Sequence, residues 1–342
     1  QKKCLIYPQN RMKILFDINH PADVHQFKHL IKELKSNKHK VLVTARDKEC
    51  THDLLRAEKI SFVPRKGYYG IVGKIFGMFL IDLFLLKQAK KFQPNLLIGS
   101  SGNCYIAQVS RLIGKPSFIF DDTEHSKLQN SLTFPFATKI ITPNCYLLDL
   151  GKKQIKYNGL KELAYLSPKY FKPNKNVLKK YKIQGKFFVL RLVSWSASHD
   201  IGFKGINVAK LVEELESKGQ ILISSELKLP KRFHKYLIKS PNDLHHLLYF
   251  ADLFIGEGAS TAAEAALLGT PSIYLNPLKL GYIDELKGYK LIFHFTDESK
   301  ALKKAIELID KNAKAQWQNK KEKLLKEKID VNEWMYNLIV NQ

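Results

Sequence analysis

Short runs of apolar residues recur along the whole chain, and stretches with helical periodicity separate them. In the first half, the runs cover 13–18, 40–45, 61–65, 94–100, 116–122 and 139–144, with helices expected near 25–36, 71–91 and 105–113. In the second half, they cover 186–194, 220–226, 252–257, 271–276 and 290–295, with helices expected at 206–219, 243–251 and 261–269. Apolar runs that alternate with helices are typical of parallel strands covered on both faces. The pattern therefore predicts an α/β protein.

The segment 147–186 interrupts this pattern and is rich in Lys, Tyr, Pro and Asn. We interpret it as the connection between two α/β domains, which a chain of 342 residues can accommodate. We expect a Rossmann-like domain over 12–165, a second one over 166–310, and a helical tail over 311–342 that packs back on the first domain. Ligands of such sheets bind beyond the carboxyl ends of the strands, so we expect a central cleft lined by the strand-to-helix loops.

Composition and charge narrow the possible partners. The chain has 56 Lys and Arg against 32 Asp and Glu, a net charge of +24, which favours an anionic partner or simply reflects lysines that keep the protein soluble. No nucleic-acid-binding motif is present, and we expect no nucleic acid partner. The four cysteines form no CxxC pair, which indicates a reducing compartment and no metal site. Residues 1–11 lack the apolar core of a signal peptide, and we interpret them as an extension before the first strand.

The stretch "GEGASTAAEAALLGTP" places a glycine turn between a strand and a helix. The free N–H groups at a helix N-terminus attract anions, so this loop is a candidate phosphate site. Its candidate binding residues are Gly256, Gly258, Ala259, Ser260, Thr261 and Glu264. Glu264 has an alternative role, because Thr261 and Glu264 have the spacing of a capping box.

Three loops of the first half carry candidate chemistry. After the first strand, Asn19 and His20 precede a helix that contains His25, and either histidine could act as a base or serve only as a cap or a half-buried helix residue. The loop with Ser100, Ser101 and Gly102 follows a strand and is either a site loop or a plain turn with a Ser/Asn cap. The third loop, "DDTEH", contributes Asp122, Glu124 and His125.

Such a density of carboxylates is costly unless it serves a purpose, and neighbouring carboxylates separate in pKa to give an acid and a base. A metal site and a solvated acidic turn are the alternatives for this loop. In the second half, the loop 191–206 follows a strand and carries Arg191 and Lys204 for phosphates, Ser194 and His199 as polar contacts, and Trp195 for stacking. Ser224, Ser225 and Glu226 end the next strand and are further candidates at the same edge of the sheet.

These motifs together resemble a known superfamily. "GASTAAEAALLGTP" is similar to the nucleotide-sugar loop of GT-B-fold glycosyltransferases, such as the enzyme that adds N-acetylglucosamine to lipid I, and of UDP-N-acetylglucosamine 2-epimerases. Over 12–309, "ILFDINHPADVHQFKHLIKEL", "FDDTEHSKLQNSLT" and "RLVSWSASHDIGFKGI" resemble the family called domain of unknown function 354. The resemblance implies a GT-B-like fold, an acceptor-side first domain and a nucleotide-sugar second domain. It also implies a ribose contact for Glu264, a nucleobase pocket at Ser224, Ser225 and Glu226, and a sugar-phosphate contact for the loop 100–102. Catalytic roles are implied for Glu124 and for the loop of His20 and His25.

We therefore expect a glycosyltransferase that moves a sugar from a nucleotide diphosphate, most simply a UDP-sugar, to a glycan or lipid-linked acceptor in cell-surface polysaccharide synthesis. A UDP-sugar 2-epimerase is the alternative. We expect no bound cofactor, because a helix N-terminus can support the leaving diphosphate.

The segment 66–91 bears on where the protein is located in the cell. It combines an apolar body with lysines and is too interrupted to span a bilayer, so it is either a helix buried on the sheet or an interfacial one. We expect a cytoplasmic protein that lies peripherally on the inner face of the membrane through this segment.

Overall fold

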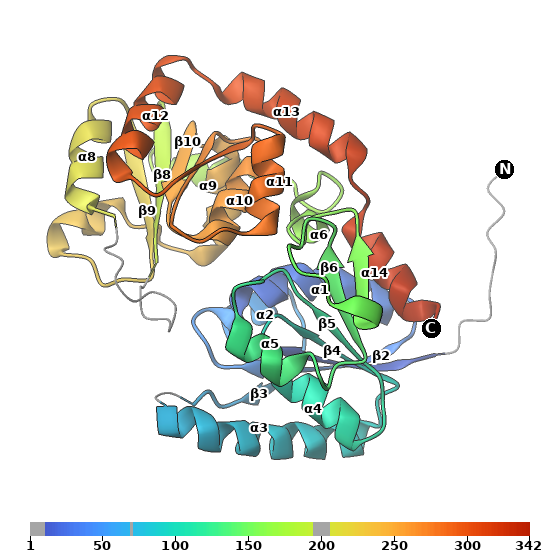
Figure 1. Ribbon diagram of the computed structural model, residues 1–342. Coiled ribbons are helices and arrows are strands. Elements are labelled where there is room, and N and C mark those ends of the chain that lie inside the picture. The colour runs from blue at the N-terminus through green and yellow to red at the C-terminus, as the bar shows by residue number, and fades with distance from the viewer. Residues whose placement is uncertain (1–10, 69–70, 194–205) are drawn as a thin grey trace. The chain divides into compact units, whose positions relative to one another are not determined.

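The computed structural model describes residues 11–68, 71–193 and 206–342, and its contacts divide the chain into two compact units. Unit 1 comprises the residues up to Tyr165 together with Ile329–Gln342, and unit 2 comprises Leu166–Lys328. Each unit is a parallel sheet with helices on both faces (Figure 1). The predicted α/β class with two Rossmann-like sheets is confirmed.

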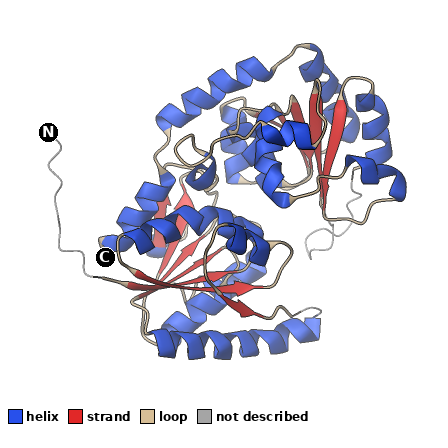
Figure 2. Cartoon of the chain, turned by 180° about the vertical axis from the view of Figure 1, so that it is seen from behind, coloured by secondary structure: helices blue, strands red, loops and turns tan. Residues whose placement is uncertain are grey.

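Unit 1 contains a seven-stranded sheet in the order β3-β2-β1-β4-β5-β6-β7, with every pair parallel. Its strands are β1 (Lys13–Ile18), β2 (Lys40–Arg46), β3 (Val63–Arg65), β4 (Leu96–Ser100), β5 (Ser117–Phe120), β6 (Lys139–Pro143) and β7 (Gln154–Tyr157). Its helices are α1 (Pro21–Ser36), α2 (Thr51–Ala57), α3 (Ile71–Phe92), α4 (Cys104–Leu112), α5 (Lys127–Thr133), α6 (Leu163–Leu166) at the boundary, and α14 (Val331–Val340). Helices α1, α2 and α14 cover one face, and α3, α4 and α5 cover the other (Figures 1 and 2).

Unit 2 contains a five-stranded parallel sheet in the order β12-β11-β10-β8-β9. Its strands are β8 (Phe187–Leu192), β9 (Gln220–Ser225), β10 (Leu253–Gly256), β11 (Ser272–Leu275) and β12 (Ile292–Phe295). Its helices are α7 (Asn176–Lys180), α8 (Val208–Glu216), α9 (Leu244–Phe250), α10 (Ala259–Leu267), α11 (Gly281–Gly288), α12 (Glu298–Asp310) and α13 (Lys314–Glu327). Short 3₁₀ turns occur at Gly151–Lys153 in unit 1 and at Lys231–Tyr236 and Pro241–Asp243 in unit 2.

The central strands of both sheets are fully buried, which explains why the apolar runs located them. Leu15, Phe16, Leu97 and Ile98 have no exposed surface in unit 1, and in unit 2 Phe188 to Leu190 and Leu253 to Ile255 are equally buried. A strand covered by helices on both faces has no polar side, so its sequence reads as a continuous apolar run.

Two predictions about the connecting segments are wrong. The segment 147–186 is not a simple connection, because Gln154–Tyr157 forms β7 and pairs with β6 at the edge of unit 1. This edge strand is half exposed and therefore lacks an apolar run. The expected tail from 311 also divides: α13 belongs to unit 2, where Trp317 is buried and its Nε1 donates to Leu291 O at 2.6 Å.

The end of the chain belongs to unit 1. Asn332 Nδ2 donates to Glu33 Oε2 on α1 at 2.7 Å, and the rings of Trp334 and Tyr157 lie 5.1 Å apart. Ile339 is fully buried. Helix α14 therefore completes the layer that starts with α1.

Candidate functional site

Each sheet reverses its winding direction at one point, and the candidate residues follow the strands that flank it. In unit 1, β1 lies between β2 and β4, so the chain winds outward in opposite directions from β1 and β4. In unit 2, the corresponding pair is β8 and β10. Loops at such switch points diverge and leave room for a ligand beyond the carboxyl ends of the strands. The loops after β1, β4, β8 and β10 were all predicted as site loops from the sequence.

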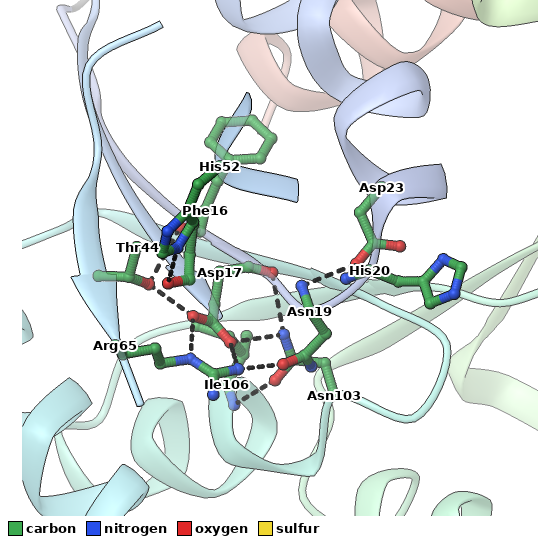
Figure 3. A network of polar contacts seen from close by, with 11 residues as sticks. Phe16, Asp17, Asn19, His20, Asp23, Thr44, His52, Arg65, Asn103 and Ile106 are labelled. Carbon is green, nitrogen blue, oxygen red and sulfur yellow. Dashed lines mark hydrogen bonds and ion pairs between the residues drawn. The ribbon is translucent and has the colours of Figure 1, made fainter. Parts of the chain in front are cut away.

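A buried polar network occupies the end of β1 (Figure 3). Asp17 is fully buried and accepts two hydrogen bonds from Arg65, Nε to Oδ1 at 2.9 Å and Nη2 to Oδ2 at 2.8 Å. Thr44 Oγ1 and Asn103 Nδ2 also donate to this carboxylate, at 2.7 and 3.0 Å. Arg65 Nη2 donates as well to Asn19 Oδ1. A buried ion pair with this many partners fixes geometry more than it adds stability, so we interpret the network as the rigid base of the switch-point loops.

Most residues of this network were not predicted from the sequence. Asp17 and Arg65 lie inside or at the end of runs that read as strands, and their charges were not weighed. One feature of the sequence could have indicated the network, namely a charged residue within an otherwise apolar strand. An ionised side chain is buried only when a partner compensates its charge, so such a residue predicts a buried ion pair.

The loop that carries His20 is locked by a reciprocal cap. His20 is the N-cap of α1 and its Nδ1 accepts from Ala22 N–H at 3.2 Å, while Asp23 Oδ2 accepts from the N–H groups of Asn19 and His20 at 2.9 and 3.0 Å. With Nδ1 as an acceptor, the neutral ring carries its proton on Nε2. Nε2 can then donate a proton but cannot take one, which disfavours His20 as the base.

His25 and Ser100 lie close to the same cap. The His25 ring is half-buried one turn into α1 and stacks on Tyr165 with ring centroids 5.3 Å apart. Burial raises the pKa of Asp23, and hydrogen bonding from the Ser100 hydroxyl opposes this change. Ser100 therefore contacts the cap at the end of β1, which joins the predicted loops after β1 and β4 in one place.

The loop after β5 gathers three buried carboxylates. Asp121, Asp122 and Glu124 are 3, 6 and 8% exposed. Ser101 Oγ lies between the first two, at 2.7 Å from Asp121 Oδ1 and 3.3 Å from Asp122 Oδ1, and Thr123 N–H donates to Asp121 Oδ1 at 2.7 Å. The predicted loops after β4 and β5 therefore meet through Ser101. The solvated acidic turn, which was the alternative, is wrong for these side chains because they are buried.

Asp121 and Asp122 have different electrostatic surroundings. Lys161 Nζ forms an ion pair with Asp122 Oδ2 at 2.6 Å. Burial lowers the pKa of Lys161, but the charges of Asp122 and Glu162 outweigh burial and raise it, so the lysine stays charged. Burial raises the pKa of Asp121 to about 6, and the nearby charges of Asp122 and Glu124 contribute to the increase. Asp121 can therefore hold a proton at a pH closer to neutrality than an ordinary aspartate, while Lys161 pairs with Asp122.

Glu124, His125 and Gly102 complete this end of unit 1. Glu124 Oε1 accepts from Leu147 N–H at 3.2 Å, which ties the loop after β5 to the loop after β6. His125 follows at the start of the turn before α5. Gly102 has φ of +72° in the turn after β4, a conformation that favours glycine. Across residues 11–68, 71–193 and 206–342, no three His, Cys, Asp or Glu side chains converge as metal ligands would.

Helix α10 of unit 2 begins at the predicted anion loop. Gly258 is its N-cap, no side chain caps it, and Ser260 and Thr261 lie in its first turn. The capping box offered as the alternative role of Glu264 does not form, because the N-cap of the helix is Gly258, three residues before Thr261. Glu264 is 7% exposed, and its Oε1 lies 3.0 Å from His245 Nε2 of α9.

Arg191 lies at the end of β8, beside this loop. Its Nη1 donates to Ser224 Oγ at 2.7 Å and its Nη2 to Glu226 Oε1 at 2.5 Å, so the ends of β8 and β9 are joined. Gly256 lets β10 approach this arginine, since a Cβ there would lie 2.7 Å from Arg191 Cβ. Ser225 is engaged differently: its hydroxyl donates to Leu227 O at 3.0 Å.

Glu257 was not predicted to act, although it sits next to Gly258. It is 3% exposed, and its carboxylate accepts from Val193 N–H at 3.0 Å and from Ile206 N–H at 2.7 Å. These two amides flank the segment 194–205. Ser194, Trp195, His199 and Lys204 of the predicted site lie in that segment, outside the described residues.

Comparisons with known proteins agree with this geometry. The family model described as "Protein of unknown function (DUF354)" matches residues 12–341. An uncharacterised protein of Methanocaldococcus jannaschii is 24% identical over 302 residues, which cover 80% of this chain and 84% of that protein.

Solved structures show the fold. The UDP-GlcNAc 2-epimerase from Neisseria meningitidis bound to UDP-GlcNAc is similar with a TM-score of 0.72 at 14% identity, covering 97% of this chain and all of that one. The spinosyn forosaminyltransferase SpnP is similar with a TM-score of 0.61 at 14% identity, over 97% and 100% of the two chains. The fold is therefore the GT-B-like fold that nucleotide-sugar epimerases and glycosyltransferases share.

Proposed function

We propose that this chain, which belongs to the DUF354 family, binds a nucleotide-diphosphate sugar and transfers the sugar to an acceptor in cell-surface polysaccharide synthesis. The observation that carries the proposal is the N-terminus of α10 at the switch point of unit 2, with Glu264 one turn inside the helix. Similar folds hold UDP-GlcNAc in the epimerases of N. meningitidis and M. jannaschii. No cofactor is required by this scheme.

We assign the donor to unit 2. The N–H groups of α10 and the hydroxyls of Ser260 and Thr261 would bind the diphosphate, and Glu264 would accept from the ribose hydroxyls. Ser224 and Glu226 would lie beside the nucleobase. Because Arg191 donates hydrogen bonds to both residues, we propose that it positions them in this pocket. Its predicted contact with phosphate would require the hydrogen bond to Glu226 to break.

Transfer needs one base to take the proton of the acceptor hydroxyl. Of the three buried carboxylates after β5 in unit 1, two are engaged by side-chain or backbone donors of the same unit. Asp122 is held by Lys161, and Asp121 accepts from Ser101 and Thr123. We therefore assign the base to Glu124, the third carboxylate of the loop after β5, with His25 as the other acid–base group of this end of the unit.

Epimerisation at C2 of a UDP-sugar is the second candidate. It needs one group to remove the proton and another to return it on the opposite face, and the carboxylates after β5 could serve because Asp121 has a pKa of about 6 and so can hold a proton near neutral pH. The higher TM-score to the N. meningitidis epimerase than to SpnP also favours it.

One experiment separates the two reactions. The protein is incubated in D₂O with UDP-, GDP- and CMP-sugars, with and without a lipid-extract acceptor, and followed by NMR. Acceptor-dependent release of the nucleotide without deuterium at C2 supports transfer. Deuterium at C2 without acceptor supports epimerisation and rejects transfer. Failure of every nucleotide sugar to bind, measured by calorimetry, would reject both.

A further inference from the structure

Large apolar side chains are exposed on one layer of unit 1. Of the eight exposed within the described residues, four lie on α3, α4 and α5, namely Phe79, Leu83, Leu112 and Leu128, and a fifth, Phe136, follows the end of α5. Phe79 and Leu128 are 62 and 69% exposed. The three helices lie side by side on the same face of the sheet (Figure 1). A soluble chain usually scatters such residues, and their concentration on one layer marks an interaction surface.

Helix α3 presents an ordered stripe on this surface. Phe79, Leu83, Lys87 and Lys90 follow one another at intervals of four, four and three residues, and all four are exposed. Residues at these intervals lie on one face of a helix. The outward face of α3 therefore changes from apolar to basic along its length. In the described part of the chain, no helix is long and apolar enough to cross a membrane.

Basic residues outnumber acidic ones on this layer. The sequences of the three helices contain four lysines on α3, Arg111 at the end of α4 and Lys127 at the start of α5. Their only carboxylate is Asp82, which is half-buried on α3. An apolar centre with a basic rim is complementary to an anionic bilayer, where side chains insert between lipids and lysines meet headgroups. A protein partner would have to be acidic over the whole layer.

A basic cavity adjoins the lysine end of the stripe. It has a volume of about 550 Å³ and is lined by Arg11, Lys13, Lys90 and Lys115, together with apolar atoms of Ala89 and Ile113. Among the residues that the structure describes, no carboxylate lines it. It lies at the amino ends of β1 and β4, opposite to the loops of the candidate site. The cavity offers four cations to one anionic group beside an apolar surface, which is the chemistry of a phospholipid headgroup.

We propose that the surface formed by Phe79, Leu83, Lys87, Lys90 and the cavity around Lys115 docks on an anionic lipid bilayer. Phe79 and Leu83 insert among the acyl chains, and the cavity holds a headgroup phosphate. The inference goes beyond the proposed reaction and does not depend on it, because vesicle binding requires neither a nucleotide sugar nor turnover.

The test is co-sedimentation of the full chain with vesicles of phosphatidylcholine alone or with 30% phosphatidylglycerol, at 0.1 and 0.5 M NaCl. We expect binding only to the anionic vesicles, weakened at high salt. Lys90→Glu with Lys115→Glu should weaken binding at least about 25-fold, since each lysine near an anionic bilayer contributes roughly fivefold. Phe79→Ser with Leu83→Ser should weaken it by roughly tenfold per side chain.

Matched controls lie in unit 2. Leu227 is 43% exposed, so Leu227→Ser removes an exposed apolar side chain outside the proposed surface. Lys323 and Lys326 are exposed on α13, so Lys323→Glu with Lys326→Glu reverses two exposed charges outside that surface. The controls should bind as the unaltered chain does. Equal binding to both vesicle types, equal losses in the controls, or a dimer that Phe79→Ser dissociates without any vesicle binding would overturn the proposal. If 10 mM inorganic phosphate binds but vesicles do not, the cavity serves free phosphate and the bilayer proposal also fails.

Discussion

Asp121 and Asp122 are adjacent in the sequence and both are buried, yet their side chains meet different neighbours. Asp122 has Lys161 at 2.6 Å. Within the described part of the chain, Asp121 accepts instead from neutral donors: the Ser101 hydroxyl, Thr123 N–H and the more distant Tyr146 hydroxyl. A neutral donor stabilises a buried carboxylate less than an ammonium group does. Burial without an adjacent cation is consistent with the raised pKa of Asp121.

The first prediction follows from this difference. The pKa of Asp121 rises from 3.8 to about 6 on folding, so its stabilising contribution is complete below pH 3.8 and is lost as the pH rises through about 6. Asp121→Asn removes the ionisation and should raise the free energy of unfolding by roughly 1–3 kcal/mol at pH 8, with little gain at pH 4.5. Urea unfolding at the two pH values measures the effect.

The control for this prediction is Asp53→Asn, because the Asp53 side chain is 77% exposed and pairs with Arg56 on the surface. It should change stability little at either pH. A gain for Asp121→Asn of the same size at pH 4.5 and pH 8 would contradict the assignment of the proton to Asp121.

Glu264 gives a second prediction at this scale. Because it does not cap α10, its removal should leave the start of the helix intact and remove the proposed ribose contact. Glu264→Gln keeps an acceptor for His245 and should weaken UDP binding about tenfold by calorimetry, with a smaller loss for dUDP. Glu213→Gln, on the exposed side of α8, is the matched control. A fall in melting temperature with unchanged affinity for UDP would show that Glu264 is structural.

At the scale of elements, the loop from β10 to α10 is the most informative part of the chain. Its sequence predicted the strand, the glycine turn and the helix start, because each is local. Glu257 acquires its role only through residues 51 and 64 positions away, Ile206 and Val193. The same carboxylate thus joins Val193 and Ile206 to the proposed phosphate loop.

A third prediction tests that organisation. Glu257→Gln leaves one acceptor oxygen where two backbone N–H groups now donate, and it places an NH₂ group against the other. Hydrogen bonds to a buried charge contribute about 1.5–3 kcal/mol, so unit 2 should lose roughly 2–3 kcal/mol in urea unfolding. UDP binding should weaken as well. Glu216→Gln on α8 is the control, and equal stability of the two variants would contradict the role of Glu257.

The limits of sequence reasoning at this scale have physical causes. The buried strands were found because both of their faces are covered, whereas β7 was missed because it is a half-exposed edge strand of four residues. The strand expected over 116–122 ends at Phe120, which puts Asp121 and Asp122 in the loop. Of the site, the loops were predictable from glycine and polar residues after apolar runs. The roles of Arg65 and Lys161 could not be predicted, since their partners Asp17 and Asp122 are 48 and 39 positions away in the sequence.

At the scale of the whole molecule, each unit has its own parallel sheet and its own buried core. Unit 1 is completed by α14 from the far end of the sequence, where Asn332 bonds to Glu33 on α1. The N–H of Ile329 also donates to Asn158 O at 3.1 Å. The stability of the unit with the proposed acid–base groups therefore depends on the last 14 residues of the chain.

A fourth prediction uses matched isoleucines of the two units. Ile339 on α14 is fully buried in unit 1, and Ile309 on α12 is 4% exposed in unit 2. A buried isoleucine replaced by alanine costs about 2–5 kcal/mol, so each substitution should destabilise its own unit. Hydrogen exchange followed by mass spectrometry should show faster exchange in β1 and β2 for Ile339→Ala and in β10 and β11 for Ile309→Ala. Faster exchange of unit 2 in the Ile339→Ala protein would contradict the assignment of α14.

The sequence by itself determined the α/β class, the buried strands and the loops that carry polar groups, because these depend on neighbours within one or two turns of chain. Only the tertiary structure decided what those groups do. In the folded chain, Asp17 pairs with Arg65 and Asp122 pairs with Lys161. Glu257 accepts from the N–H groups of Val193 and Ile206, and His20 caps α1. The physical reason is that burial, charge pairing and hydrogen bonding depend on distance in space, and parallel strands bring together loops that lie far apart along the chain.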